Sequence, residues 1–214
     1  SIRVTTGLHP SPYFSAGKLV WLLRNSPEVK EAQASGRLRF GTIDSWLIAR
    51  LSNGAYVTDA TNASRTLLFD LNTGDWSQEM LDCFEIPGGT LPEIVPSIGC
   101  CAVAHEGSLV GRGVPVSGIA GDQQSALFGH LAISKGATKV TYGTGCFLLH
   151  HAGGKRPADI ESLLTTVALA QPTGLTYAYE GSVFTGGALV QWFRDELGLI
   201  NSAEEIEALA HQVV

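Results

Sequence analysis

One acidic residue, Asp122, lies where chemistry is commonly done in α/β proteins. It follows the apolar run of residues 114–119, which predicts a buried strand, and it precedes Gln123 and Gln124. Ligands of α/β sheets bind at the carboxyl ends of strands, and a carboxylate there can accept a proton from an alcohol. An Asp before a helix is also a common N-cap, a role worth about 1 kcal/mol. The pattern leaves both roles open for Asp122.

A second group of candidate residues is the turn Gly143-Thr144-Gly145. Such a turn can offer backbone N–H groups and a hydroxyl to phosphate oxygens. By its pattern alone, an ordinary hairpin turn is the better interpretation. Neither G-x-x-x-x-G-K-S/T nor G-x-G-x-x-G occurs in the chain, which excludes a P-loop and a dinucleotide fingerprint. Any nucleotide site must therefore be of another kind.

Two neighbouring histidines, His150 and His151, follow Cys146 closely enough to raise the question of a metal site. Neighbouring residues on a strand point to opposite faces, so these histidines cannot converge on one ion. No cluster of carboxylates accompanies them in the sequence. We therefore expect no metal site built from this pair.

Periodicity and turn residues indicate the elements that must position these groups. Helices are expected at residues 18–23, 43–51, 77–84, 125–131 and 186–197. Strands are expected at residues 65–70 and 114–119, and hairpins at 139–142 with 146–151 and at 163–170 with 175–179. Residues 87–113 are rich in Gly and Pro and predict a surface loop. This order predicts an α/β protein of two units that meet near residues 131–135.

The composition excludes several classes of protein. The chain has 214 residues, 44% hydrophobic and 16% charged, so it has ample material for a buried core. Its net charge of -6 and the lack of a Lys/Arg run argue against a nucleic-acid partner. Apolar runs are far shorter than the roughly 20 residues that cross a bilayer, so no membrane span is expected. The four cysteines lack disulfide or zinc spacing and predict reduced thiols in a cytoplasmic protein.

The two ends of the chain predict that the polypeptide has been cut from a longer one; a processed start with a frayed end is the alternative. The first residue is Ser1, and the only methionine is Met80. At the other end, Ser202 and Glu205 have the spacing of a capping box, which predicts a helix that stops at Val214 without a cap.

Six stretches in order along the chain carry distinctive residue patterns. They are YFSAGKLVWLLRN at 13–25, FGTIDSWL at 40–47, TDATNASRT at 58–66, GIAGDQQ at 118–124, TYGTGCF at 141–147 and EGSVF at 180–184. Together they resemble the FGGY family of carbohydrate kinases, most narrowly its glycerol kinases. The resemblance extends over nearly the whole chain.

The resemblance implies an actin-like, ribonuclease H-like ATPase fold with the active site between two domains. Residues 1–131 would form the second half of the N-terminal domain, on the glycerol side. Residues 132–214 would begin the C-terminal domain, on the nucleotide side. The implied reaction is ATP-dependent phosphorylation of glycerol to sn-glycerol 3-phosphate, and the full-length enzyme is expected to be a homo-oligomer.

On the acceptor side, the resemblance implies roles for four residues. Asp122 is similar to the family's general base, which takes the proton from a terminal glycerol hydroxyl, and it would also face a Mg ion through water. Tyr13 and Gln123 resemble the residues that hydrogen-bond the glycerol hydroxyls. Phe147 resembles the aromatic residue that packs against the carbon chain of glycerol.

On the nucleotide side, the resemblance implies that ATP contacts the turn and the helix that follows the second hairpin. Gly143 and Thr144 look like the phosphate-side turn, which replaces the hairpin interpretation. Gly187 and Gln191 look like nucleotide contacts at the start of the helix. The family's N-terminal phosphate-binding loop and its adenosine-binding loop are expected outside this sequence.

Two other interpretations remain. A related FGGY kinase for another polyol or a sugar would share the same patterns, and a substrate panel would separate it from a glycerol kinase. A non-catalytic fragment is the other alternative, because the expected flanking loops are missing.

Overall fold

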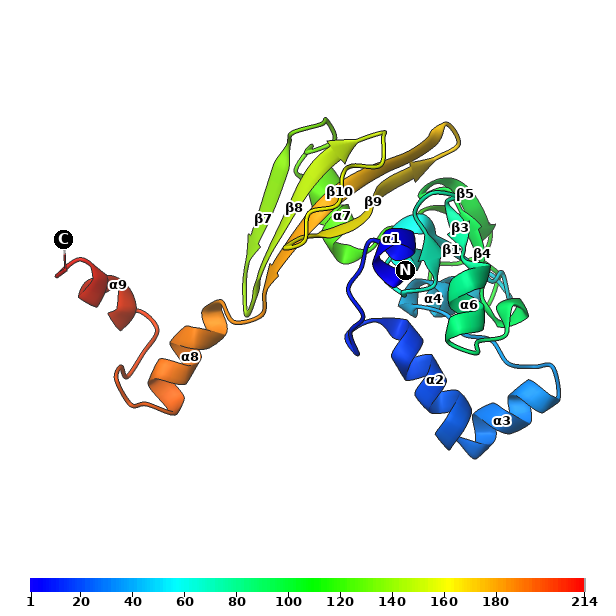
Figure 1. Ribbon diagram of the computed structural model, residues 1–214, viewed down its shortest axis with the longest axis horizontal. Helices are drawn as coiled ribbons and strands as arrows, with labels where there is room; N and C mark the ends of the chain where they lie inside the picture. The colour runs from blue at the N-terminus through cyan, green and yellow to red at the C-terminus, as the bar shows by residue number, and fades with distance from the viewer. Residues whose placement is uncertain (214) are drawn as a thin grey trace.

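The computed structural model describes residues 1–213. They form two parts, the second of which is built on a four-stranded sheet (Figure 1). The first part carries short helices and short strand pairs. Its helices are α1 (Ile2–Thr6), α2 (Ser15–Asn25), α3 (Pro27–Ala34), α4 (Ile43–Leu51), α5 (Ala60–Ala63) and α6 (Gln78–Cys83), with a 3-10 turn at Gly88–Thr90.

Three strand pairs complete this first part. Strands β1 (Val57–Asp59) and β4 (Glu93–Val95) are parallel. Strands β2 (Phe69–Asp70) and β3 (Asp75–Trp76) are antiparallel, as are β5 (Ile98–Val103) and β6 (Pro115–Gly118). These pairs are short, so packing between helices and loops contributes much of the core of this part.

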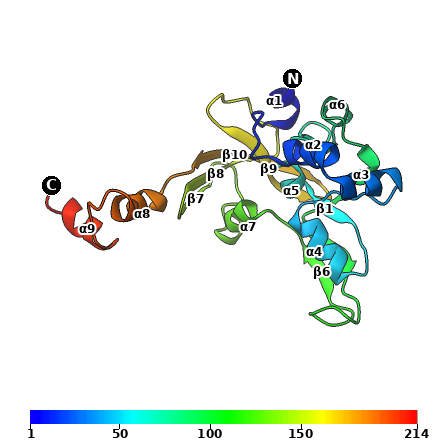
Figure 2. The same ribbon diagram turned by 90° about the horizontal axis from the view of Figure 1, so that it is seen from below.

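The second part is an antiparallel sheet with one helix on it. Its strands are β7 (Thr138–Tyr142), β8 (Cys146–Gly153), β9 (Leu164–Gln171) and β10 (Gly174–Val183), in the spatial order β7-β8-β10-β9. Helix α7 (Asp122–Gly129) lies against one face of this sheet, where Leu127 packs with Leu149, Ala168 and Ala178 (Figure 2). Both predicted hairpins are confirmed.

Buried side chains from both parts share one core. Phe69 and Leu71 pack with Val167 of β9 and Tyr177 of β10. The Tyr177 hydroxyl donates a hydrogen bond to the Leu71 carbonyl at 2.9 Å. The sheet is therefore fixed to the first part by packing as well as by chain connection.

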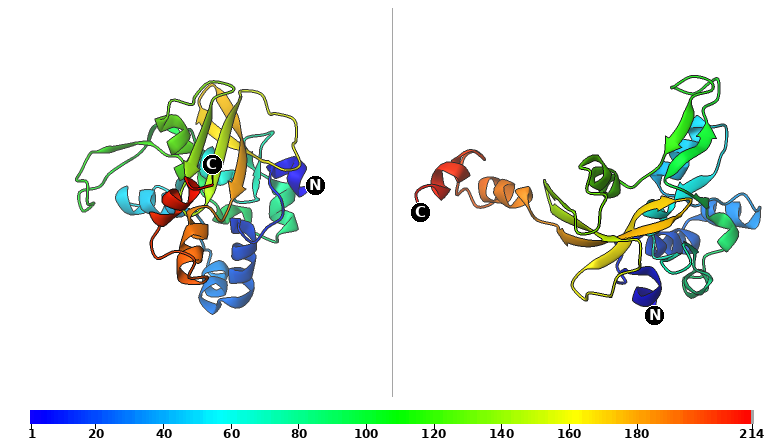
Figure 3. Two further views of the ribbon diagram at one scale, coloured as in Figure 1. Left: turned by 90° about the vertical axis from the view of Figure 1, so that its left-hand side faces the viewer. Right: turned by 90° about the horizontal axis from the view of Figure 1, so that it is seen from above.

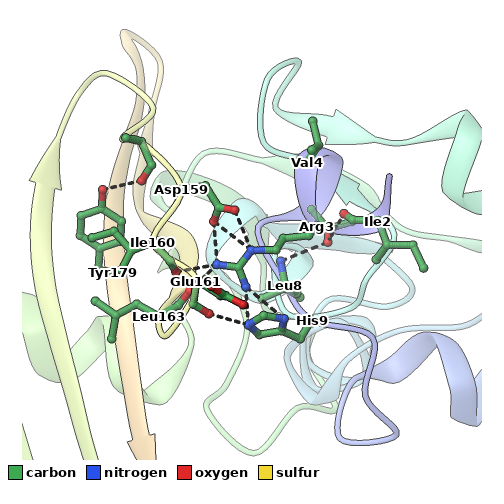
Figure 4. Close-up of polar contacts among 12 residues, drawn as sticks. Ile2, Arg3, Val4, Leu8, His9, Asp159, Ile160, Glu161, Leu163 and Tyr179 are labelled. Carbon is green, nitrogen blue, oxygen red and sulfur yellow. Dashed lines mark hydrogen bonds and ion pairs between the residues drawn. The ribbon is translucent and has the colours of Figure 1, made fainter.

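A polar network also ties α1 to the segment between β8 and β9 (Figure 4). The Arg3 guanidinium donates to both oxygens of Asp159, with Nη2 to Oδ1 at 2.6 Å and Nε to Oδ2 at 2.7 Å. It also donates to the carbonyls of Ile160 and Leu163, and it lies against His9. The Arg3 side chain thus joins α1 to the segment between β8 and β9.

The last two helices, α8 (Gly187–Asp195) and α9 (Glu205–Ala210), project away from the sheet (Figure 3). No residue of α8 is buried, and its predicted apolar face, with Leu189 and Trp192, is open to solvent. The last helix was expected to run to Val214, but α9 ends at Ala210, with His211 as its C-cap residue. Val214 itself lies outside the described residues.

Local signals explain why most predicted helices are confirmed. Helix α4 has the predicted bounds, and Asn53 and Gly54 after it have φ values of 61° and 104°, left-handed conformations that end a helix. Helix α6 begins after Ser77, whose hydroxyl accepts the Met80 N–H at 3.3 Å. Helix α7 begins at Asp122, earlier than the predicted residue 125.

Several strand and loop predictions are wrong. The expected strand at 65–70 is reduced to Phe69–Asp70, because Leu67 adopts a left-handed φ of 68° that no strand permits. The expected loop at 87–113 contains the whole of β4 and of β5. The strand at 114–119 exists as β6 but is mostly exposed, because it belongs to a two-stranded ribbon.

The predicted capping box at the start of α9 is also wrong. The helix begins at Glu205, with Glu204 as its N-cap residue. The Glu205 carboxylate accepts the backbone N–H of Asn201 at 3.0 Å. Glu205 therefore reaches back to Asn201 and not to Ser202.

Candidate active site

Asp122 is the first residue of α7 and is exposed to solvent. Its Oδ1 accepts the backbone N–H of Gln123 at 2.8 Å. Gly121 is the N-cap residue, so the N-cap alternative for Asp122 is wrong. Within residues 1–213, Oδ2 of Asp122 has no hydrogen-bond donor, which leaves it open to a substrate. The start of a helix also favours a negative charge at this position.

A buried polar network holds the turn that presents Asp122. The Gly121 N–H donates to Thr61 Oγ1 at 2.8 Å, and this hydroxyl donates to both oxygens of Asp59. Asp59 is fully buried and also accepts hydrogen bonds from Asn62 and from the Ser97 hydroxyl, the latter at 2.5 Å. The start of α7 is therefore anchored to the end of β1.

Gln123 points to the sheet, where it meets a buried lysine. Lys139 of β7 is only 4% exposed, and its Nζ donates to Gln123 Oε1 at 2.7 Å and to Thr141 Oγ1 at 2.6 Å. Burial lowers the pKa of Lys139, whereas the negative charges of Asp122 and Glu180 act in the opposite direction.

Phe147 shares this face of the sheet. It lies on β8, directly opposite Thr141 of β7 and Ser182 of β10. Directly opposed residues of antiparallel strands point to the same face. Leu149, two residues further along β8, packs with Leu127 of α7, so this face is the one that α7 covers. The structure therefore brings Asp122, Gln123 and Phe147 to one region.

Tyr13 lies before α2 and contacts the residue that follows β10. Its ring lies 5.8 Å from that of Phe184, which follows β10, and 5.9 Å from the guanidinium of Arg65. Arg65 pairs with the buried Glu180 of β10 at 2.7 Å. Within the described chain, the Tyr13 hydroxyl makes no hydrogen bond and remains open to a ligand.

The four predicted nucleotide contacts line one open cavity of about 540 Å³. Its lining includes Gly143 and Thr144 from the turn and Gly187 and Gln191 from α8. The Gly187 N–H donates to the Gly143 carbonyl at 2.7 Å. A Cβ on Gly187 would lie 2.9 Å from that same oxygen, so only glycine permits this close approach.

Metal-ligating side chains do not gather in the part of the chain that the structure describes: no group of three His, Cys, Asp or Glu residues is placed to hold an ion. As predicted, His150 and His151 point apart. His150 Nδ1 lies 2.8 Å from the Thr138 hydroxyl, while His151 is buried on the other face, and burial lowers its pKa. Asp122 remains the candidate carboxylate for an ion held mainly by water and phosphate.

Sequence reasoning missed three residues that complete this site. Lys139 and Glu180 are buried charges that lie opposite Leu149 of β8 from its two sides, and Phe184 packs against Tyr13. One available signal was the two-residue alternation of the hairpin, which puts Lys139 on the same face as Thr141. A lysine on a face that a helix covers needs a specific partner.

The fold and the candidate site together point to one class of protein, the carbohydrate kinases. Residues 1–129 match the N-terminal domain of the FGGY family of carbohydrate kinases. The chain belongs to this family, which confirms the resemblance drawn from its motifs.

Within residues 1–213, no helix is both long enough and apolar enough to span a membrane.

Curated proteins similar to this chain include glycerol kinases. The chain is 50% identical to that of Shewanella frigidimarina (strain NCIMB 400) over 213 residues and to that of Halorhodospira halophila (strain DSM 244 / SL1) over 214 residues. Each alignment covers 99% of this chain but 42% of the relative. The chain therefore spans less than half the length of the curated relatives it matches.

Solved structures support the same fold. The crystal structure of Plasmodium falciparum glycerol kinase with ADP is 36% identical, with a TM-score of 0.90 over 99% of this chain and 42% of that one. A xylulose kinase from Rhodospirillum rubrum is 19% identical with a TM-score of 0.82, a likeness of fold alone. The predicted actin-like, ribonuclease H-like ATPase fold is confirmed, and the chain covers part of it.

Proposed function

We propose that the protein carrying this chain is an ATP-dependent glycerol kinase that forms sn-glycerol 3-phosphate. The observation that carries the proposal is the position of Asp122, whose free carboxylate oxygen lies at the start of α7 beside Gln123. The names of the relatives at 50% identity support glycerol as the acceptor. The chain supplies the acceptor side of the site and part of its nucleotide side.

In the proposed reaction, a terminal hydroxyl of glycerol attacks the γ-phosphorus of ATP. The new O–P bond forms as the bond to the ADP oxygen breaks, and Oδ2 of Asp122 takes the hydroxyl proton. Gln123 and Tyr13 hold the other hydroxyls, and the Phe147 ring covers the carbon chain. A small triol needs this combination of polar and apolar contacts.

The nucleotide phosphates would lie at the cavity between the turn and α8. The close approach of Gly143 and Gly187, and the exposed hydroxyl of Thr144, fit a group that contacts backbone. Mg²⁺, when bound with ATP, neutralises phosphate charge, and a single carboxylate such as Asp122 suits an ion that keeps several waters. Gln191 would contact the nucleotide from α8.

The proposal also covers the domain division, the cellular compartment and the assembly of the protein. Residues 1–131 belong to the N-terminal domain and residues 132–214 to the start of the C-terminal domain. The protein acts in the cytoplasm. The complete enzyme is a homo-oligomer.

The test is ADP release by the complete protein encoded by the gene, with Mg-ATP and a panel of glycerol, erythritol, xylulose and gluconate. We expect glycerol to give the highest kcat/KM, because the site presents two polar side chains and one aromatic ring to a short chain. A higher kcat/KM with a longer polyol or a sugar would favour another FGGY kinase. No ADP release with any acceptor would indicate a non-catalytic protein.

A further inference from the structure

Lys139 is a buried ammonium that the proposed reaction does not use. It is the second residue of β7 and faces α7, and only 4% of it is exposed. Burying an ammonium is costly unless hydrogen bonds compensate for the lost water. Both of its recorded hydrogen bonds go to neutral oxygens, Gln123 Oε1 at 2.7 Å and Thr141 Oγ1 at 2.6 Å.

The charges around Lys139 do not form an ion pair with it. Asp122 faces it from α7 and Glu180 from β10, but neither carboxylate comes within 4.0 Å of Nζ in the described chain. Glu180 is engaged with Arg65 at 2.7 Å and with the Ser182 hydroxyl at 3.2 Å. One of the two hydrogen bonds that Lys139 does make is to Gln123, the residue next to the proposed base.

This contact decides which end of the Gln123 carboxamide faces a ligand. A carboxamide has one acceptor oxygen and one donor NH2 group. Lysine only donates, so Lys139 can bond the oxygen and not the NH2 group. The NH2 group of Gln123 is then left at the opposite end, and it has no acceptor within residues 1–213.

We propose that Lys139 is a positioning residue that fixes the Gln123 carboxamide with its NH2 group toward the acceptor substrate. This inference rests on the proposed function for the identity of the substrate. With NH2 outward, Gln123 can donate to a hydroxyl oxygen but cannot accept a hydroxyl proton. The proton of the attacking hydroxyl is thereby directed to Asp122, the only acceptor of the two.

The first test is a double-mutant cycle in the complete protein encoded by the gene, with Lys139→Met, Gln123→Ala and the double variant. Loss of a buried, charge-assisted hydrogen bond is expected to raise the KM for glycerol by about 10- to 100-fold. The KM for ATP should change by less than about twofold, because the loss is confined to the acceptor side. In the Gln123→Ala background, Lys139→Met should add less than about twofold.

A conservative variant separates positioning from packing. Lys139→Arg keeps donors that can reach the Gln123 oxygen and should restore much of the glycerol KM that Lys139→Met loses. Losses that add in the double variant, or an equal rise in both KM values with a lower Tm, would overturn the proposal. Lys139 would then act on the fold and not on Gln123.

A second measurement does not depend on kinase activity. In nitrogen-15 NMR spectra, the side-chain amide of Gln123 is assigned from its absence in Gln123→Ala, and its order is read from relaxation. We expect an ordered amide in the wild type and a mobile one in Lys139→Met. Order unchanged by Lys139→Met would overturn the inference even in an active glycerol kinase. Order lost in that variant would support it even if glycerol were not the substrate.

Discussion

Two aspartates that each lie between a strand and a helix have different surroundings in the folded chain. Asp59 ends β1 and caps α5, where its side chain accepts the Asn62 N–H at 3.1 Å, and it is fully buried. Asp122 follows β6 and begins α7, and it is exposed with one oxygen free. Asp59 therefore stabilises the fold, whereas the exposed carboxylate of Asp122 is accessible to a substrate.

The ion pair of Arg65 and Glu180 predicts a large cost when one partner is removed. Glu180 is 2% exposed, so Arg65→Met leaves a buried carboxylate without its cation. We expect the free energy of unfolding to fall by about 3–5 kcal/mol, measured by urea denaturation. The double variant Arg65→Met/Glu180→Gln should recover most of this loss.

An exposed pair provides the control for this prediction. Arg24 and Glu85 lie 2.9 Å apart with both side chains largely exposed. Arg24→Met should cost less than about 1 kcal/mol. Similar losses from Arg65→Met and Arg24→Met would contradict the role given to the buried pair.

At the scale of elements, the contact of the Gly143 turn with α8 decides the shape of the proposed phosphate site. In Gly187→Ala, the new methyl group would meet the Gly143 carbonyl at 2.9 Å, so the turn or the helix must move. We expect ADP affinity, measured by calorimetry on the complete protein, to fall by about tenfold, roughly 1.4 kcal/mol.

Gly17→Ala is the matched control, because a Cβ there meets nothing within 4 Å. It lies inside α2, where Ala is favoured over Gly by about 0.5–1 kcal/mol. This variant should bind ADP normally and be slightly more stable. Unchanged ADP binding by Gly187→Ala would show that the turn does not contact the nucleotide.

The tie between α1 and the segment before β9 predicts a pH dependence. The Arg3 hydrogen bond holds the pKa of Asp159 below its ordinary value of 3.8, and the positive charges of Arg3, His9 and Arg156 act in the same direction. A carboxylate with a lowered folded pKa stabilises the fold above its unfolded pKa. This contribution is lost as the pH falls through the folded pKa, so it should be complete at pH 7 and fade below about pH 4.

The measurement is a carbon-13 NMR titration of the Asp159 carboxyl group. In Arg3→Gln the midpoint should move upward toward that of an unpaired Asp. A midpoint that is the same in wild type and Arg3→Gln would mean that the network of Figure 4 does not persist in solution.

The sequence predicted elements well where local signals are strong. Both hairpins and the helices with clear stop or cap residues, such as Asn53 after α4 and Ser77 before α6, were expected within a few residues. The expected strand at 65–70 failed because the conformation of Leu67, buried in the core, is set by tertiary packing. Periodicity carries no information about such a choice.

The candidate site could likewise be predicted from the sequence only in part. The sequence makes Asp122 a candidate because its position after a strand has a chemical meaning, and the family resemblance proposes roles for its neighbours. Lys139 was not found, because its importance depends on Gln123 approaching it from α7 across 16 positions in sequence. A contact between separate elements cannot be derived from spacing along one of them.

At the scale of the whole molecule, α8 and α9 stand apart from the body (Figures 1 and 3). Large apolar residues of α8, among them Trp192 at 47% exposed, are open to solvent. Few buried contacts imply low local stability. This 214-residue chain should therefore behave as a stable body with a weakly held C-terminal segment.

Hydrogen exchange of the isolated chain tests this difference. Amides of α8 should exchange with little protection, while those of β8 and β10, which pair along most of their length, should be protected by several orders of magnitude. Equal protection of α8 and β10 would contradict it. That result would indicate that α8 packs against another surface in solution.

The central claim is that Asp122 is the base of a glycerol kinase. The most direct measurement is kcat for glycerol-dependent ADP release by the complete protein, compared among wild type, Asp122→Asn and Asp75→Asn. Asp75 is the matched control, since its Oδ1 also accepts the next backbone N–H, at 2.7 Å, outside the site. We predict that Asp122→Asn lowers kcat by about 10²- to 10⁴-fold, while Asp75→Asn leaves it unchanged. A kcat retained in Asp122→Asn would contradict the account.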